Sequence, residues 1–408
     1  MNPREIRGIE IAGQGKIKKT AKGWIVPSQT WSHNYIVKMK GDKMSCNCSD
    51  CQLKGVKCKH QFAVEEFIQN QADRKTNKIK IVRQTYPQNW KAYNDAQSEE
   101  IRLFDILLSD LVSSIPDEQI KKKGRPVLSL NETLFCTIQK VYSQLSQRRA
   151  HSLHERASQY NQIKHAPHYN AVGKLLNQKR LIPILHQLLV TTAKPLNSVE
   201  TCFAQDSSGF ATTRYNEYYG QKYNVKRRQK WVRAHILVGT KTNIIVGAKI
   251  TDDYDADSPE FRPLLTEAHE NGFDIKEITA DKAYSSRDNL EAAKKIGAIP
   301  YIPFKSSTVD KCRGSFYWSK MFHYFMTYRD EFMEHYHKRS NVESTFMMIK
   351  ANFGERLKSK NDVAQKNELL CKLIAHNIVV LIHEIHELGI KAEFGNESDN
   401  SSLTEVRQ

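Results

Sequence analysis

The chain of 408 residues lacks the features of membrane and secreted proteins. No run approaches the ~20 apolar residues that a membrane span needs, and no signal peptide is visible at the N-terminus. No internal repeat is present either. These absences predict a cytoplasmic protein without disulfides or membrane contact. The length and the 39% hydrophobic content favour two or three domains with cores of their own.

Acidic residues are fewer than basic residues. The chain has 45 Asp and Glu against 62 Lys and Arg, which gives a formal net charge of +17. Such an excess favours a polyanionic partner, although basic runs are often no more than solvated surface. The basic residues are concentrated at 121–125 and in a second group formed by Lys222, Lys226, Arg227, Arg228, Lys230 and Arg233.

Cysteine is scarce, and half of the eight cysteines lie between positions 46 and 58. Cys46 and Cys48 are followed by Cys58 and His60. Three thiolates and an imidazole are the ligands of a closed, tetrahedral structural Zn²⁺ site. Buried thiols without metal are the alternative, but unrelated thiols rarely occur as two close pairs with a histidine. The pattern therefore predicts one structural zinc ion, with Cys51 outside the ligand set.

A helix with one polar face is predicted in the C-terminal third. Tyr336, Arg339, Glu343 and Lys350 fall within about 60° of one another at ~100° per residue. An apolar stripe over 342–353 would dock the helix on a core. A solvated charged face is the alternative interpretation, and carboxylates elsewhere in the chain weaken it.

Two of those carboxylates, Asp206 and Asp281, each follow a segment with a β-strand pattern and precede a turn. Either Asp alone is weak evidence, because turns favour Asp for their own hydrogen bonds. Together with Glu343 they form an Asp, Asp, Glu set, the ligand type that Mg²⁺ or Mn²⁺ prefers. Two such ions roughly 3.5–4 Å apart would activate an attacking hydroxyl and stabilise the leaving oxygen in phosphoryl transfer.

These motifs resemble those of known families. The four residues of the polar helix face have the spacing of the Tyr-Arg-Glu-Lys signature of DDE transposases from prokaryotic insertion sequences. Segment 281–286 resembles their second-Asp motif, and 257–259 is also similar to theirs. This resemblance covers about residues 198–388, and the short interval before Glu343 leaves little room for the large β-rich insertion of some members. The cysteine spacing resembles the SWIM zinc finger over about residues 22–70.

The resemblance implies a ribonuclease H-like fold and an enzyme that cuts its own element ends and joins the 3′ ends to target DNA. Asp206, Asp281 and Glu343 would hold two Mg²⁺ or Mn²⁺ ions, and a homo-oligomer would act on double-stranded DNA near the nucleoid. Arg339 and Lys350 would hold phosphates near the scissile bond, and Tyr336 would contact DNA or orient the nucleophile. The basic group adds Arg227, Arg228 and Lys230 as further DNA-contacting candidates. A transposase-derived DNA-binding protein without activity is one alternative, which a missing acid would have favoured. A nuclease of the same fold is another.

A mixed α/β domain, with a mixed sheet flanked by helices, is predicted from the residue pattern as well. After the strand before Asp206, the predicted elements are strands at 231–238 and 243–250, a helix at 258–270, the strand before Asp281, a helix at 286–296 and a strand at 298–304. Ser258 is the predicted N-cap of the first helix. Two prolines restrict the last strand to the edge of the sheet.

Residues 98–197 are predicted to be helical, with helices at 98–112, 131–145, 149–160 and 168–178. The last two would form a helix-turn-helix that presents Tyr169, Asn170 and Lys174 to a DNA groove, or else a plain helical linker. The zinc finger is predicted to contain a strand at 35–39 and a helix at 61–71. The predicted domains are the small zinc finger at 1–72, a linker at 73–97, the helical region at 98–197, the catalytic domain at 198–388 and a disordered tail at 389–408.

Overall fold

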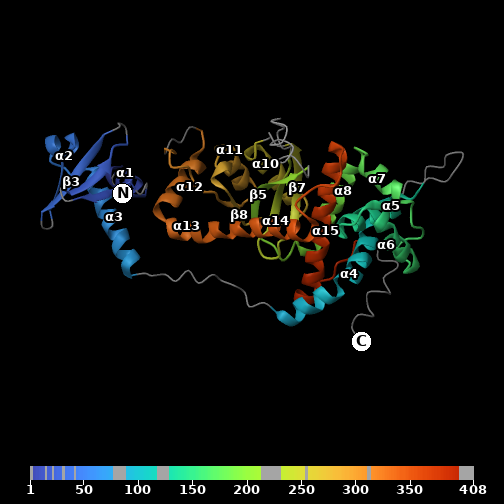
Figure 1. Ribbon diagram of the computed structural model, residues 1–408. Coiled ribbons are helices and arrows are strands. Elements are labelled where there is room, and N and C mark those ends of the chain that lie inside the picture. The colour runs from blue at the N-terminus through green and yellow to red at the C-terminus, as the bar shows by residue number, and fades with distance from the viewer. Residues whose placement is uncertain are drawn as a thin grey trace, which may run out of the picture. The chain divides into compact units, whose positions relative to one another are not determined.

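The structure is a computed structural model that describes residues 3–13, 16–20, 23–29, 33–40, 43–76, 89–116, 128–212, 231–252, 256–309 and 314–394. The predicted basic segments at 121–125 and 222–230, and the tail from 395 on, lie outside these residues. The chain divides into two compact units, Met1–Pro87 with Phe304–Glu334 and Gln88–Pro303 with His335–Gln408. Figure 1 labels their elements.

The first unit contains a four-stranded antiparallel sheet in the order β1-β2-β3-β4. Its elements are α1 (Pro3–Gly13), β1 (Lys18–Thr20), β2 (Gly23–Pro27), β3 (Asn34–Lys40), β4 (Lys43–Cys46), α2 (Ser49–Lys54), α3 (Lys59–Thr76), α12 (Phe316–Thr327) and most of α13 (Arg329–Tyr336). Trp24, Val26 and Val37 contribute to its core. The strand predicted at 35–39 and the helix predicted at 61–71 are confirmed as β3 and α3.

Helix α12 belongs to this first unit although its sequence lies between Asp281 and Glu343. Phe304 meets the rings of Trp318 and Phe322 edge to face at centroid distances of 4.8 and 5.3 Å. A Cβ built on Gly13 of α1 would meet Met326 of α12, so the two helices approach closely. The sequence patterns did not predict this association, because local periodicity carries no information about contacts between distant segments.

The second unit is built on a five-stranded mixed sheet in the order β7-β6-β5-β8-β9. The strands are β5 (Cys202–Ala211), β6 (Trp231–Gly239), β7 (Ile245–Asp252), β8 (Glu277–Ala280) and β9 (Ile299–Tyr301). β5, β6 and β7 pair antiparallel, whereas β8 and β9 continue from β5 in parallel. The predicted strands are confirmed, and β9 lies at the sheet edge as its prolines require.

Two local predictions were wrong. Asp206 does not end its strand, because β5 stays paired with β6 from Phe203 to Ala211. Ser258 is not the N-cap of its helix, since the helical segment begins with the 3₁₀ turn η2 (Ser258–Glu260) and Asp257 takes the N-cap position. Pairing with β6 continues β5 beyond Asp206, and Asp257 accepts from the Ser207 hydroxyl of β5 instead of capping its own turn.

Helices cover the sheet and form the rest of this unit (Figure 1). They are α4 (Trp90–Ser113), α5 (Leu130–Tyr142), α6 (Gln147–Gln159), α7 (Tyr169–Leu176), α8 (Leu181–Ala193), η1 (Lys194–Leu196), η2, α10 (Phe261–Glu270), η3 (Lys282–Tyr284), α11 (Arg287–Lys295), η4 (His337–Arg339), α14 (Ser340–Phe353) and α15 (Asp362–Leu388). The predicted linker 73–97 is partly helical, because α3 extends to Thr76 and α4 begins at Trp90. Asn89 caps α4 by accepting from the Ala92 N–H, and Ala92 and Ala96 are buried.

Helix α15 is the central helix of the second unit. It is long and apolar enough to cross a membrane by length and composition, but 83% of its most apolar window is buried within the fold. Its buried polar side chains bond neighbouring elements: Asn377 accepts from the Ile245 N–H of β7, and Asn367 donates to the Leu176 carbonyl of α7. We therefore interpret α15 as a core helix rather than a membrane span.

The turn between β6 and β7 packs against the buried side chain of Glu200, and a substitution can test this contact. Glu200 is 1% exposed and accepts hydrogen bonds from the Thr242 N–H and hydroxyl, which hold its side chain in place. A Cβ on Gly239 would overlap Glu200. We expect Gly239→Ala to lower the free energy of unfolding by about 1–3 kcal/mol, measured by denaturant titration.

Gly247→Ala in β7 is the matched control, since its Cβ would meet the nearest atom, of Leu264, at an ordinary 3.5 Å. Equal stability losses in the two variants would show that Glu200 does not constrain the turn.

Candidate active site and metal centre

Strands β5 and β8 place Asp206 and Asp281 side by side. The two strands are parallel, and Gln205 pairs with Ala280, so the next residues along each strand are Asp206 and Asp281. Paired positions in a sheet project to the same face. Asp281 ends its strand and caps η3 by accepting from the Lys282 N–H. The two predicted carboxylates therefore lie at one face of the sheet.

Glu343 reaches the same face from α14, which contacts β5 and β6. Arg339 joins the acids: its Nη1 donates to Asp206 Oδ2 at 2.7 Å, and its Nη2 donates to Glu343 Oε1. The structure thus brings together the three acids that the sequence predicted. It also shows that the Arg339 guanidinium contacts carboxylates.

The acids influence each other electrostatically. Burial raises the pKa of Asp206 above its usual value, and the negative charges of Asp281 and Glu343 raise it further. The Ser207 N–H and the Arg339 charge act in the opposite direction. Carboxylates that crowd in this way favour a bound cation, and hard oxygen donors suit Mg²⁺ or Mn²⁺. The three residues fit such an ion in chemistry and in charge.

The remaining signature residues surround this cluster. Tyr336 ends α13, and its ring centroid lies 6.0 Å from the Arg339 guanidinium. Lys350 Nζ donates to Ser208 Oγ at 2.8 Å and lies 5.3 Å from the Phe210 ring centroid. The predicted single helix is interrupted, because Arg339 lies in the 3₁₀ turn η4. All four signature side chains nevertheless gather near β5.

The other predicted DNA contacts have different outcomes. Arg227, Arg228 and Lys230 lie outside the residues that the structure describes. In the predicted helix-turn-helix, α7 buries Val172, Leu175 and Leu176 and leaves Asn170 and Lys174 exposed.

The sequence analysis did not predict a group of contacts around Glu277, which we call the Glu277 anchor, next to the turn that carries Arg339. Glu277 Oε2 accepts from Lys338 Nζ at 2.8 Å and lies 3.0 Å from His335 Nδ1. The His335 ring stacks on Tyr301 at a centroid distance of 4.3 Å. These contacts hold the turn that carries Arg339 against β8 and β9. No sequence signal pointed to them, because Glu277 belongs to no motif.

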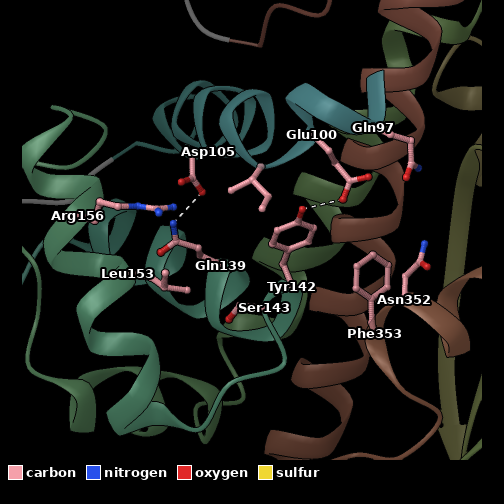
Figure 2. A pocket seen from close by; sticks show the side chains of 11 residues that line it. Gln97, Glu100, Asp105, Gln139, Tyr142, Ser143, Leu153, Arg156, Asn352 and Phe353 are labelled. Carbon is pink, nitrogen blue, oxygen red and sulfur yellow. Dashed lines mark hydrogen bonds between the residues drawn. The ribbon is translucent and has the colours of Figure 1, made fainter. Parts of the chain in front are cut away.

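A cavity of about 480 Å³ lies elsewhere in the second unit, lined by residues of α4, α5, α6 and the end of α14 (Figure 2). Asp105 is buried in its wall and accepts from Gln139 Nε2 at 2.7 Å, and the Tyr142 hydroxyl donates to Glu100. Burial raises the pKa of Asp105. None of the three clustered acids lines this cavity.

The first unit brings Cys46, Cys48, Cys58 and His60 together, all buried, with their ligand atoms within 4.8 Å of one another. His60 Nδ1 lies 3.7 Å from Cys46 Sγ and 3.9 Å from Cys58 Sγ, so Nδ1 faces the thiols. The hydrogen bond from the Cys46 thiol is the main cause that lowers the pKa of Cys58 to about 4. Three sulfurs and one nitrogen at this spacing fit a tetrahedral zinc ion.

One known protein family matches the segment that contains the second unit's sheet. Residues 197–378 match the family model described as the transposase DDE domain. This segment is a DDE transposase domain. The domain has the ribonuclease H-like fold, with which the mixed sheet and its flanking helices agree. No solved structure matches the chain. The N-terminal cluster is compatible with a zinc finger.

The Glu277 anchor of the DDE domain should depend on pH. Burial alone would raise the pKa of Glu277, but hydrogen bonds from Lys338 and His335 lower it below its usual value. The anchor therefore stabilises the fold at neutral pH and is lost as the pH falls below about 4.5 through the lowered folded-state pKa. We expect Glu277→Gln to cost about 1–2 kcal/mol at pH 7 and progressively less at lower pH.

Thermal unfolding from pH 7 to pH 3 measures this, with the exposed Glu355→Gln as the control. A destabilisation that stays constant over this range would contradict the anchor.

The cysteine cluster yields a metal-removal test. Cys58→Ser or His60→Ala should release zinc and unfold the β1–β4 sheet, because metal binding contributes on the order of 10 kcal/mol to such small units. Cys51→Ser should keep the metal, since Cys51 is not one of the four clustered residues. Elemental analysis and circular dichroism of the purified chain measure both. Loss of zinc from Cys51→Ser would mean that the fourth ligand is wrongly assigned.

Proposed function

We propose that the protein is the transposase of a prokaryotic insertion sequence, which cuts the ends of its element and joins the 3′-OH ends to target DNA. One observation carries the proposal. The parallel register of β5 and β8, together with the bridging Arg339, gathers Asp206, Asp281 and Glu343 at one face of a DDE transposase domain.

The three acids would hold two Mg²⁺ or Mn²⁺ ions, since their oxygens are the ligands these cations prefer. Such ions, when bound, activate the attacking oxygen and stabilise the leaving oxygen of phosphoryl transfer. Arg339 has five N–H donors, so its guanidinium can contact a DNA phosphate as well as the two carboxylates. Lys350 adds a second cation on the Asp206 face of β5, and Tyr336 would contact DNA beside them.

The rest of the chain would bind and organise DNA. The net charge of +17 supports double-stranded DNA as the partner, because phosphate contacts dominate affinity for such proteins. Asn170 and Lys174 of α7, with Arg227, Arg228 and Lys230, would contribute contacts. We propose that the protein acts in the cytoplasm as a homo-oligomer on DNA, with a SWIM-type finger at 1–72, a helical DNA-binding region at 98–197 and the catalytic domain at 198–388.

The decisive experiment uses purified protein and labelled DNA that carries the element ends. Asp206→Asn, Asp281→Asn and Glu343→Gln should each lower cleavage by on the order of 10³-fold or more, because the three acids act as a unit. Binding to the same DNA should remain close to wild type, since phosphate contacts elsewhere are retained. Cleavage and a gel-shift measurement report the two properties separately.

The outcomes also separate the alternatives. Cleavage without joining to target DNA would identify a nuclease of the same fold. Specific binding without cleavage by the wild type would identify a transposase-derived DNA-binding protein. Wild-type cleavage by one of the three variants would remove that residue from the site.

A further inference from the structure

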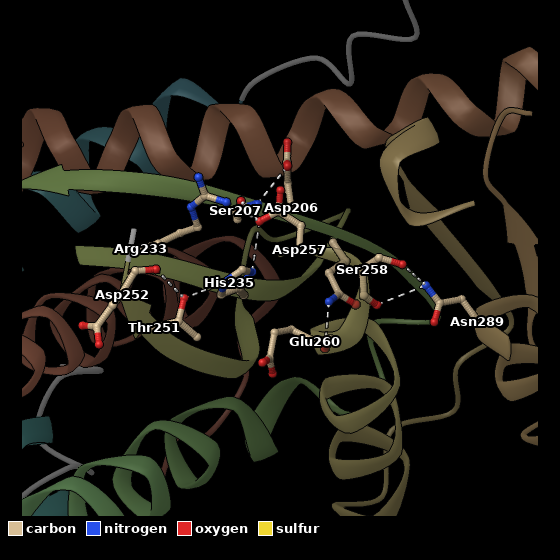
Figure 3. Close-up of polar contacts among 11 residues, drawn as sticks. Asp206, Ser207, Arg233, His235, Thr251, Asp252, Asp257, Ser258, Glu260 and Asn289 are labelled. Atoms are coloured by element: carbon tan, nitrogen blue, oxygen red, sulfur yellow. Dashed lines mark hydrogen bonds and ion pairs between the residues drawn. The ribbon is translucent and has the colours of Figure 1, made fainter. Parts of the chain in front are cut away.

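The face of β5 opposite the acids carries a second set of polar contacts (Figure 3). Since side chains alternate along a strand, Gln205 and Ser207 project away from the Asp206 side. The Ser207 hydroxyl donates to Asp257 Oδ1 at 2.7 Å, and Gln205 Nε2 donates to the Glu260 carbonyl at 3.1 Å. Both neighbours of Asp206 are therefore held by one segment, 257–260.

Asp257 also binds the adjacent strand. Arg233 Nη1 of β6 donates to Asp257 Oδ1 at 2.8 Å, and His235 Nδ1 lies 3.5 Å from the same oxygen. His235 is fully buried, and its Nε2 lies 2.9 Å from the Thr251 hydroxyl of β7. Asp is a favoured N-cap residue, yet Asp257 forms no side-chain cap bond with its own helical turn. Its carboxylate is engaged with the sheet instead.

Segment 257–260 is bonded to the Asp281 side of the site as well. Asn289 of α11 is 2% exposed and donates through Nδ2 to both the carbonyl and the hydroxyl oxygen of Ser258, at 3.2 and 3.1 Å. The same Nδ2 donates to the Tyr284 carbonyl at 2.9 Å. Tyr284 ends η3, the turn that begins directly after Asp281. Figure 3 shows Ser258 and Asn289 facing each other.

We propose that segment 257–260 fixes the spacing of Asp206 and Asp281, with Asp257 as a positioning residue that acts through Ser207. This inference rests on the proposed two-metal function. Two adjacent carboxylates repel each other, and small displacements of catalytic groups reduce activity strongly. Strand pairing sets the register of β5 and β8. The segment contacts the residues on both sides of Asp206 and is linked to the turn after Asp281 through Asn289. Asp257 itself contacts Ser207, Arg233 and His235.

The test measures Mn²⁺ affinity of the full chain by titration calorimetry without DNA, alongside cleavage and thermal unfolding. Asp257→Ala should weaken Mn²⁺ binding about 10–100-fold, the range found when residues that orient metal ligands are removed. Asp257→Asn should recover part of the affinity, because its amide oxygen still accepts from Ser207. Ser207→Ala should weaken binding in the same direction, and the double variant Ser207→Ala/Asp257→Ala should lose less than the sum.

Asp288→Ala is the matched control, since Asp288 also pairs with an arginine, Arg262 at 3.8 Å, but is largely exposed on α11. It should bind Mn²⁺ like the wild type. If Asp257→Ala fails to fold, Ser207→Ala decides, because it removes one hydroxyl and leaves the half-buried Asp257 carboxylate paired with Arg233. Wild-type Mn²⁺ affinity in Ser207→Ala and in any folded Asp257 variant would overturn the positioning role. Wild-type affinity in Asp206→Asn would refute the metal site of the proposed function instead.

Discussion

Mutual repulsion between carboxylates is the constraint on which the DDE domain depends. Asp206, Asp281 and Glu343 come from separate elements, and a fold that gathers them must compensate their charge. Arg339 does so in this structure by donating to Asp206 and Glu343 at once. The compensation is incomplete, because burial and the neighbouring charges still raise the pKa of Asp206. A site with this residual negative charge is suited to divalent cations.

The helix that carries Glu343 is fixed at both ends. Before it, Lys338 in η4 donates to Glu277 at 2.8 Å. After it, Lys372 of α15 donates to the Gly354 and Arg356 carbonyls at 2.7 and 2.9 Å. Burial lowers the pKa of Lys372 to about 8, so this contact is costly to form. The hydrogen bonds of Lys372 connect the end of α14 to the central helix α15.

The first unit contains a small sheet with a small hydrophobic core. Its buried residues are few, and three of them are the cysteines of the metal cluster. α12, from a segment that lies between the second and third acids in sequence, packs against α1 of the same unit. Residues 304–334 therefore belong to the same compact unit as the predicted finger.

Sequence alone predicted most of the elements and the candidate site residues. The strands, the edge position of β9, the zinc ligand pattern and the three acids follow from periodicity, proline positions and residue type, which are local properties. Three features depend on the tertiary structure. Arg339 contacts two of the acids, and Asp257 binds β5 rather than capping its helix. Residues 304–334 join the N-terminal unit. Apart from the local Arg339–Glu343 pair, each of these depends on contacts between segments far apart in the chain. A hydrogen bond or ion pair across such a distance leaves no periodic trace in the sequence.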